Sequence, residues 1–455
     1  MCLKQVLLPT YQNSLAAMRL VRCCQLQGLM SKVQGPGFCV DVTYLVLLFG
    51  LEARAKAQDF CMHAPTDVPH YDIDFYSDAV IADPQPHYRA MRALGPVVFL
   101  PVHGNYAFTH HQTVKHGLRN HTDFISGEGL SADDFGSNLQ RGNVVASDPP
   151  RHTAMRKAML PTLMPKAIDG LRQQFDGIAT ELVEALVSRA QFDTVTEFAS
   201  ILPLTVVRDL IGLPAFGRTH MLKWASGAFD IAGIQNVRGQ KGVETTAEMR
   251  DFIRENLTAE DAREGSWVQR IFDLEKNGKL EAEFVPFLIR DYINPSLDTT
   301  ISAIGHLVHQ LAQHPDQWTL LRARPELSKK AISEAVRLGT PIRSFARIAA
   351  NETRVAGVTI PKGARVMMLF ASANRDEAVF ENADRFDIER AESDHLGFGH
   401  GIHTCVGMHL AQMEMMSLLT AMIPAVGRIE TGVAVPAMNN TICGFEALPT
   451  IFHRA

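Results

Sequence analysis

The longest run of helically spaced apolar residues lies at about positions 281–313 and ends at His314-Pro315. This spacing predicts one long helix. Pro295 has no N–H to donate to the Asp291 carbonyl, so we expect a kink there, with the Thr299 hydroxyl hydrogen-bonded to the Pro295 carbonyl. Further amphipathic patterns predict helices at 168–187 and 198–211.

Short β-branched and apolar runs predict a smaller β component. Strands are expected at 97–100 and 106–109, paired across a short turn, and a β-hairpin is expected from 355–360 and 364–371. The polar, glycine-containing stretch at 123–145 predicts a long loop with little regular structure.

Composition favours a globular protein with a large core. Hydrophobic residues make up 46% of the 455 residues and charged residues 20%, and the net charge of −5 argues against a nucleic-acid surface. No Ser/Gly-rich or Pro-rich linker divides the chain, so we expect one large domain at 62–455.

Residues 1–61 differ from the rest of the chain. They carry six Lys/Arg and three Asp/Glu, a net charge of +3, whereas the remainder carries −8. The apolar run at 42–51 is shorter than the roughly 18 residues that span a bilayer, so no integral membrane segment is expected. Our hypothesis is that Met62 is the natural start and that 1–61 is upstream sequence; the alternative is a disordered or membrane-associated leader. Only Cys405 and Cys443 follow Met62, which predicts reduced cytoplasmic thiols.

One cysteine stands in a glycine-punctuated loop directly before an apolar helical pattern at about 406–422. The loop reads Phe398-Gly399-His400-Gly401-Ile402-His403-Thr404-Cys405-Val406-Gly407. A cysteine ligates metal as the thiolate, and the N–H groups at a helix N-terminus supply the positive potential that lowers a thiol pKa. The glycines let the backbone approach a flat macrocycle. We interpret Cys405 as a thiolate bound to iron; the alternative is a buried structural cysteine in a Gly-rich turn.

This loop resembles the haem-ligand signature of the cytochromes P450, Phe-Gly-x-Gly-x-His-x-Cys-x-Gly, and fills every specified position. The resemblance runs from about Tyr71 to the C-terminus. It implies a mainly α fold with small β-sheets (α+β), with haem b, iron protoporphyrin IX, between the long helix and the Cys405 loop. Besides the iron ligand Cys405, it implies cofactor contacts from His152, Arg156, Arg347, Phe398, His403 and Gly407.

His152 and Arg156 stand one helical turn apart, and two donors on one helix face suit a carboxylate. Spacing alone is equally typical of a solvated helix face. The resemblance implies that this pair binds one haem propionate and that Arg347 binds the other.

Asp298 and Thr299 resemble the acid–alcohol pair of the family's oxygen-activation motif, which implies that Thr299 supports oxygen activation and that Asp298 helps to gate protons. Pro295 and Ser296 replace the two small residues of that motif. On spacing alone, Asp298 would be a capping or salt-bridging carboxylate and Thr299 a packed hydroxyl.

Glu334 and Arg337 have the spacing of a surface ion pair, but they resemble the family's buried Glu-x-x-Arg, which implies a structural network with Arg390. Arg343 is left open between substrate and solvent. The residues expected to line the substrate pocket are Phe124, Ile125, Leu130, Pro295, Leu297, Ile342 and Phe445.

The resemblance implies a monooxygenase that inserts one atom of dioxygen into a C–H bond of a small hydrophobic or aromatic substrate. Separate partners, a ferredoxin or flavodoxin with an NAD(P)H-dependent reductase, are expected to supply electrons. The Pro-Ser-Leu-Asp-Thr-Thr variant is most similar to bacterial enzymes that O-demethylate methoxy-aromatics. Terpene or fatty-acid hydroxylation is the alternative within the class. A peroxide-driven enzyme, against which the acid–alcohol pair counts, and a non-catalytic haem-binding sensor are the alternatives outside it.

Overall fold

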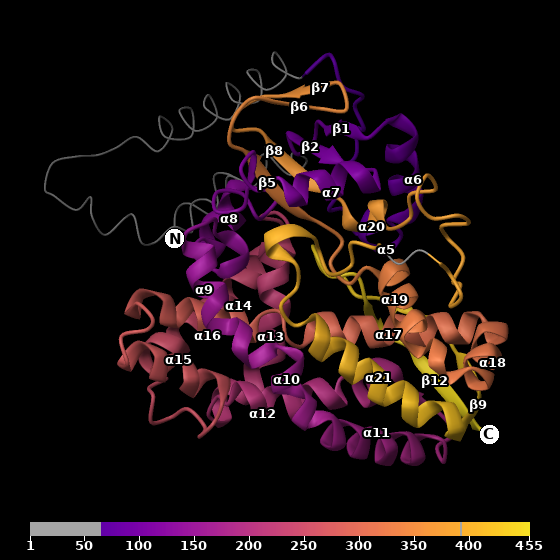
Figure 1. The fold of residues 1–455 in the computed structure, drawn as a ribbon. Coiled ribbons are helices and arrows are strands. Elements are labelled where there is room, and N and C mark those ends of the chain that lie inside the picture. The colour runs from indigo at the N-terminus through magenta and orange to yellow at the C-terminus, as the bar shows by residue number, and fades with distance from the viewer. Residues whose placement is uncertain (1–64, 392–393) are drawn as a thin grey trace, which may run out of the picture. The chain divides into compact units, whose positions relative to one another are not determined.

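The computed structural model describes residues 65–391 and 394–455, so the predicted extension at 1–61 lies outside the described residues. Residues Thr66–Ala455 form one compact unit. Within it, a large helical part packs against a smaller part that holds a mixed sheet (Figure 1). The α-helices are α5 (Asp78–Ala82), α6 (Gln85–Leu94), α7 (His111–Arg119), α8 (Asp134–Gln140), α9 (Arg151–Leu163), α10 (Pro165–Ile168), α11 (Arg172–Leu186), α12 (Arg208–Ile211), α13 (Ala215–Ile231), α14 (Val237–Glu255), α15 (Trp267–Lys276), α16 (Val285–Ile293), α17 (Asp298–Gln313), α18 (Pro315–Ala323), α19 (Ser328–Gly339), α20 (Phe370–Ala373) and α21 (Met408–Ala425).

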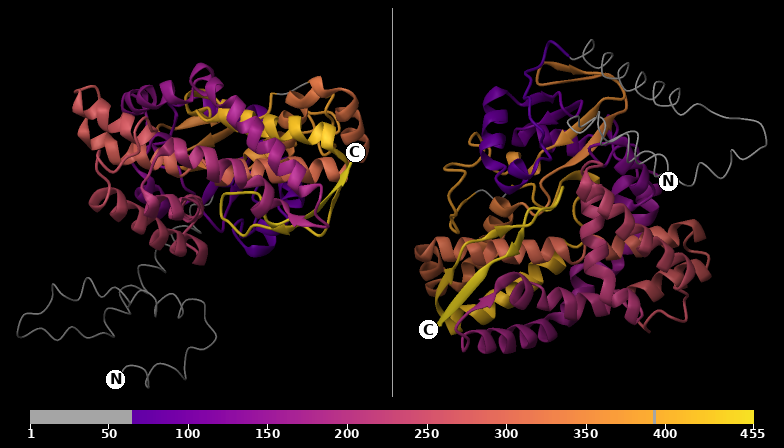
Figure 2. Two further views of the ribbon diagram at one scale, coloured as in Figure 1. Left: turned by 90° about the horizontal axis from the view of Figure 1, so that it is seen from below. Right: turned by 180° about the vertical axis from the view of Figure 1, so that it is seen from behind.

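The main sheet has the strand order β1-β2-β8-β5-β3. Strands β1 and β2 pair antiparallel as predicted, β2 and β8 run parallel, and β5 joins β8 to β3. The strands are β1 (Val97–Leu100), β2 (Asn105–Phe108), β3 (Phe124–Ile125), β4 (Phe192–Asp193), β5 (Phe345–Ala349), β6 (Thr353–Val355), β7 (Val358–Ile360), β8 (Arg365–Met368), β9 (Val426–Thr431), β10 (Val435–Pro436), β11 (Phe445–Ala447) and β12 (Pro449–Arg454). Strands β4, β12 and β9 form a second sheet, whose yellow C-terminal strands lie in front of the helices when the molecule is seen from behind (Figure 2, right).

Two predictions about the β component are wrong. The stretch at 123–145 is not a structureless loop, because it contains β3, α8 and the start of the 3₁₀ turn η1 (Val144–Ala146). The expected hairpin across Pro361 does not form, because β8 pairs with β2 and β5 while β7 pairs with β6. In both cases, distant strands supply the pairing that the local pattern could not show.

The predicted long helix is broken rather than kinked. It consists of the 3₁₀ turn η5 (Ala282–Phe284), α16 and α17, and residues 294–297 separate the two α-helices. Pro295 cannot continue the ladder, and the Ser296 hydroxyl donates instead to the Tyr292 carbonyl. As predicted, Thr299 Oγ1 donates to the Pro295 carbonyl at 2.9 Å. Two side-chain hydroxyls therefore replace backbone donors at the break.

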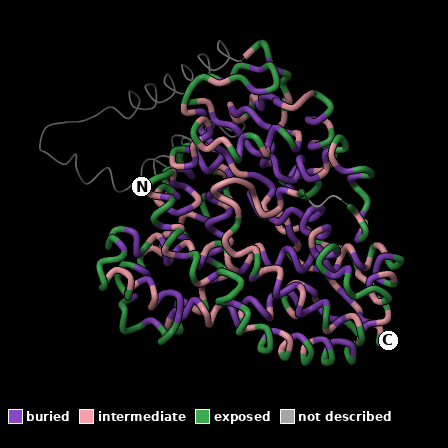
Figure 3. The backbone as a smooth tube through the Cα atoms, viewed as in Figure 1, coloured by how far each residue is buried: buried purple, intermediate pink, exposed green. Residues whose placement is uncertain are grey.

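The helices bury one face each. On α11 the buried residues recur at helical spacing, as its amphipathic pattern predicts; they are Phe175, Ala179, Val183 and Leu186. Exposed residues follow the outer side of this helix (Figure 3). Helix α11 packs on α21, and α17 packs on α19. In the described part of the chain, every helix is too short or too polar to cross a membrane.

Candidate haem site

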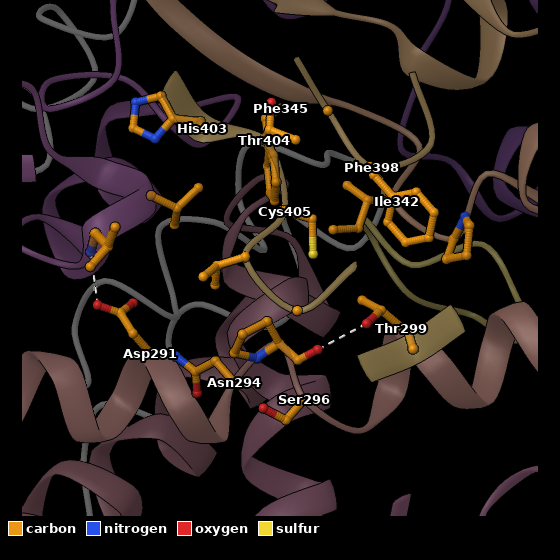
Figure 4. A pocket seen from close by; sticks show the side chains of 18 of the residues that line it. Asp291, Asn294, Ser296, Thr299, Ile342, Phe345, Phe398, His403, Thr404 and Cys405 are labelled. Carbon is orange, nitrogen blue, oxygen red and sulfur yellow. Dashed lines mark hydrogen bonds between the residues drawn. The ribbon is translucent and has the colours of Figure 1, made fainter. Parts of the chain in front are cut away.

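A cavity with about 1720 Å³ of empty space, partly open to solvent, lies between the α16–α17 break and the loop that precedes α21. Figure 4 shows Cys405 on one side of this space and Asp291, Asn294, Ser296 and Thr299 on the other. The break removes helical backbone where the two sides face each other. The space is therefore bounded by the two segments that the sequence singled out.

The loop geometry presents Cys405 to the cavity. Its backbone N–H donates to the Phe398 carbonyl at 2.8 Å, and Gly399 and Gly401 adopt positive φ angles of 68° and 74°. A Cβ on Gly401 would lie 2.5 Å from the Leu118 carbonyl oxygen, so the loop packs against α7 only with glycine there. The Cys405 side chain is exposed, and because it lines the cavity, this surface faces the cavity.

Backbone donors point at the Cys405 sulfur, as the helix N-terminus predicts. Burial raises the pKa of the free thiol, while the Gly407 N–H, the Arg156 guanidinium and the Met408 N–H oppose that rise. Gly407 has an ordinary φ of −85°, and a Cβ there would lie 3.9 Å from the sulfur. The positive potential needed to stabilise a thiolate is thus built from backbone groups and one arginine.

Cationic and donor groups gather at one end of the site. Arg156, Arg347 and His403 line the cavity, and the His152 ring packs against the His403 ring with centroids 4.5 Å apart. Burial, and then the charge of Arg347, lower the pKa of His403 to about 2. Burial also lowers the pKa of His152, and that of Arg347 to about 10. The two imidazoles are therefore neutral donors beside two guanidinium charges.

This end fits an anionic group. His152 Nε2 is buried without a hydrogen-bond partner, and within the described residues Arg347 hydrogen-bonds only to the Ala346 carbonyl, at 2.7 Å. Arg156 donates to the Thr404 carbonyl at 2.5 Å. A buried guanidinium such as that of Arg347 is costly without a carboxylate bonded to it, and among the described residues Asp148 acts on it only through its charge, so this end is complementary to further carboxylates. The two propionates of haem meet that requirement.

The acid–alcohol pair is split. Thr299 lines the cavity, but Asp298 does not. The Asp298 carboxylate instead accepts a hydrogen bond from Ser226 and lies near Asp230, both on α13; burial is the main reason that its pKa rises to about 6. The sequence predicted the two residues as neighbours, and the position of α13 decides which way Asp298 points.

The expected pocket residues divide into two groups. Pro295 and Ile342 line the cavity, as does Phe398, which was predicted as a cofactor contact. The other five lie elsewhere, which corrects the expectation. Phe124 and Ile125 form β3 and pair with β5, and the Phe124 ring packs on Phe108. The other residues outside the cavity lining are Leu130, Leu297 and Phe445.

These displaced residues have clear structural roles. Leu130 accepts a backbone hydrogen bond from Ala346 and is buried, as is Leu297 at the start of α17. Phe445 packs against the His306 and His309 rings on α17. Arg343 faces neither substrate nor solvent, because it is 2% exposed and donates to the Ile442 carbonyl at 2.8 Å.

Sequence reasoning missed several polar residues that line the cavity. Asp291 and Asn294 interrupt the apolar pattern before Pro295, and Glu414 is a carboxylate in an otherwise apolar stretch of α21. Burial raises the pKa of Glu414 well above its ordinary value. Each was visible as a polar break in an apolar helix.

The structure brings Glu334, Arg337 and Arg390 together. Both Glu334 oxygens accept from Arg337 at 2.7 Å, and Arg390 Nε donates to one of them at 3.0 Å. Arg337 is 1% exposed and also donates to the carbonyls of Asn374 and Ala383. This buried network holds α19 against the segment at 374–390, away from the cavity.

The fold, the cysteine in the cavity and the cationic wall together define a haem-thiolate protein. A profile of the family described as Cytochrome P450 matches residues 317–425. The chain is 33% identical to cytochrome p450 CYP199A2 of Rhodopseudomonas palustris over 84% of this chain and 94% of that protein. It is 34% identical to linalool 8-monooxygenase of Pseudomonas putida over 63% and 71%. The chain belongs to the cytochrome P450 family.

The structural comparison agrees. The cytochrome P450 CYP109Q5 from Chondromyces apiculatus superimposes with a TM-score of 0.69 at 25% identity, covering 84% of this chain and 99% of that one. The mainly helical fold with small sheets, predicted from the sequence, is confirmed. The protein is therefore a monooxygenase of this family, and its cofactor is haem b, held through a cysteine.

Proposed function

We propose that Cys405 is the haem ligand and that the protein O-demethylates a small methoxy-aromatic by inserting one oxygen atom into a methyl C–H bond. The observation that carries this proposal is the Cys405 sulfur, which faces a cavity whose other wall is the helix break with Thr299. Haem held by the Cys405 thiolate would supply the oxygen chemistry, because a thiolate ligand pushes electron density onto the iron and favours O–O cleavage. The hydroxymethyl product then collapses to formaldehyde and a phenol.

The cavity lining supports an aromatic substrate. Phe229, Phe345 and Phe370 line it together with Ile342, and apolar surface predominates. Planar rings pack favourably against such side chains. Terpene hydroxylation is the second candidate, because linalool 8-monooxygenase is among the relatives.

Residues of the chain would hold the cofactor and handle protons. His152, Arg156, Arg347 and His403 would bind the propionates, and Phe398 would lie against the ring. The Thr299 hydroxyl already donates to the Pro295 carbonyl, so its oxygen can accept a hydrogen bond from a donor in the cavity. Asp298, with a pKa raised to about 6, would exchange protons near neutral pH from the α13 side.

The electrons would come from a separate ferredoxin or flavodoxin and its NAD(P)H-dependent reductase. We place the reaction in the cytoplasm, where such carriers are reduced and where Cys405 and Cys443 stay out of disulfides.

Binding titration of the purified ferric protein tests the substrate class. Guaiacol, 4-methoxybenzoate, linalool and a fatty acid are added in turn while the haem absorption band is followed. A saturable shift with a methoxy-aromatic, followed by formaldehyde release with a competent redox chain, is the expected result. A shift with linalool alone would discard O-demethylation, and NADH oxidation that never yields product would favour a sensor.

Replacing Thr299 by valine keeps the shape of the side chain and removes its hydroxyl. We expect NADH oxidation to continue while product formed per NADH falls by roughly tenfold or more, because proton transfer loses a positioned group. The readouts are product, NADH and hydrogen peroxide, measured together. Thr299→Ser, which keeps the hydroxyl, should retain coupling; equal losses in both variants would contradict the role.

Replacing Arg347 by methionine removes a buried charge from the cationic end. We expect the haem dissociation constant to rise by roughly tenfold or more, since a charge-assisted hydrogen bond to a propionate is lost. The measurement is haem transfer to an excess of an acceptor protein, in which the rate of haem loss should rise with the dissociation constant. Arg354→Met, at an exposed position of β6, is the control. Unchanged haem retention in Arg347→Met would show that Arg347 is not a propionate partner.

A further inference from the structure

One corner of the cavity wall is polar. Gln140, Asn143, Asp291 and Asn294 all line the cavity, and we refer to these four residues as the polar corner. The loop before η1 meets α16 here, because the Val144 N–H donates to Asp291 Oδ2 at 2.8 Å. Gln140 Nε2, at the end of α8, donates to the Ala228 carbonyl at 3.1 Å, which ties α8 to α13. Figure 4 shows Asp291 and Asn294 on the wall that continues to Thr299.

The polar corner contains acceptors that lack donors. Asn143 is 3% exposed, and its Oδ1 is buried without a hydrogen-bond partner. Asn294 Oδ1 is likewise buried and unpartnered. Leaving such oxygens unsatisfied is costly, so a ligand that donates a hydrogen bond here would provide the partner that they lack among the described residues.

The cations nearest to the polar corner are turned away from the cavity. Arg151 pairs with Glu283 at 3.1 Å and lies 4.5 Å from the centroid of the Phe284 ring, and Arg290 lies over the Phe287 ring. Neither arginine lines the cavity. Burial raises the pKa of Asp291 to about 7, although the Val144 N–H and both arginines act against the rise. A ligand at the polar corner therefore meets acceptors and a carboxyl group, while the guanidinium groups that line the cavity, those of Arg156 and Arg347, belong to its cationic end.

We propose that the polar corner binds an uncharged hydrogen-bond donor of the substrate, a hydroxyl on an otherwise apolar molecule, and disfavours a carboxylate at the same position. The inference rests on the proposed function in taking this cavity as the substrate site. A hydroxyl can donate to Asp291, Asn143 or Asn294. A carboxylate can accept from the asparagine amide groups, but it cannot donate to Asp291 and it brings a second negative charge beside that carboxyl group. Among methoxy-aromatics, the protein would take methoxyphenols in preference to methoxybenzoates.

Matched alcohols and acids on two scaffolds test this inference. The ligands are the three methoxyphenol isomers, the three methoxybenzoates and anisole, together with geraniol and geranic acid. Dissociation constants of the holoprotein are measured by calorimetry and by haem absorption at about pH 8, where the acids are ionised. Whichever scaffold binds, we expect the alcohol to bind roughly tenfold or more tighter than the acid.

Two variants assign the preference to the polar corner. Asp291→Asn keeps an acceptor for the Val144 N–H and removes the charge, so it should strengthen acid binding and narrow the alcohol-to-acid ratio by roughly tenfold. Asn294→Leu should weaken alcohol binding and leave anisole unchanged. Asp230→Asn changes a buried carboxyl outside the cavity lining and should leave the ratio as it is.

The outcomes separate this inference from the proposed function. Three outcomes would each overturn the proposed role of the polar corner. The acids could bind as tightly as the alcohols, Asp291→Asn could leave the alcohol-to-acid ratio unchanged, or every alcohol on both scaffolds could fail to bind. Tight alcohol binding without formaldehyde release would support the polar corner and overturn O-demethylation.

Discussion

Replacing Cys405 by serine is expected to abolish the thiolate-type absorption band of the reduced carbon monoxide complex. Monooxygenase turnover should fall by roughly three orders of magnitude or more, equivalent to about 4 kcal/mol of lost barrier lowering. The reason is chemical, because serine cannot supply the electron-rich sulfur that Cys405 presents to the cavity. Absorption spectra and product formation with a competent redox chain measure both effects.

Cys443→Ser is the matched control. Cys443 is the other free cysteine among the described residues, and it lies outside the cavity lining with its N–H donating to the Pro341 carbonyl at 2.8 Å. Its substitution should leave the band and the turnover in place. A normal thiolate band in Cys405→Ser would refute the assignment of the ligand.

Glu334→Ala should be the most destabilising of the substitutions considered. It leaves the Arg337 guanidinium, which is 1% exposed, without its carboxylate inside the protein. Removing one partner of a buried ion pair costs about 3–5 kcal/mol of unfolding free energy. Urea unfolding of the haem-loaded protein, followed by circular dichroism, measures the change.

The control for Glu334→Ala is another Glu–Arg pair at the surface. Glu326 accepts from Arg324 at 3.1 Å, and its side chain is 65% exposed. Glu326→Ala should change the unfolding free energy by about 1 kcal/mol or less, since solvent screens such pairs. If the two variants lose the same stability, Glu334 does not act as the buried partner of Arg337.

The family and the cysteine loop were predictable because the chemistry lies in contiguous sequence. Ten residues around Cys405 carry the ligand, the glycine turns and the helix N-terminus, and no distant segment is needed to recognise them. The helical patterns at 168–187 and 281–313 were predictable for a similar reason, since periodicity is local. The kink at Pro295 and the Thr299 hydrogen bond were predicted too, but the full four-residue break after α16 was not, because the Ser296 hydroxyl also bonds to the Tyr292 carbonyl.

The cavity lining was harder to predict because the direction of a side chain depends on tertiary packing. Phe124 was expected in the pocket, but strand pairing with β5 turns it toward Phe108. Asp298 was expected beside Thr299 in the cavity, but its carboxylate hydrogen-bonds to Ser226 on α13 instead. The polar corner joins residues of two segments about 150 positions apart, and the local sequence of either segment does not predict its contact with the other.

The buried Arg347 guanidinium also bears on how the protein is made. Until an anion binds, the folded chain keeps a buried charge that the unfolded chain would leave in water, so the cofactor-free form is the less stable one. A ligand that binds only the folded state shifts the folding equilibrium by mass action. Yield in a recombinant host will therefore follow the supply of haem during synthesis, and supplementation with a haem precursor will raise the recovered amount of intact protein more than slower expression alone.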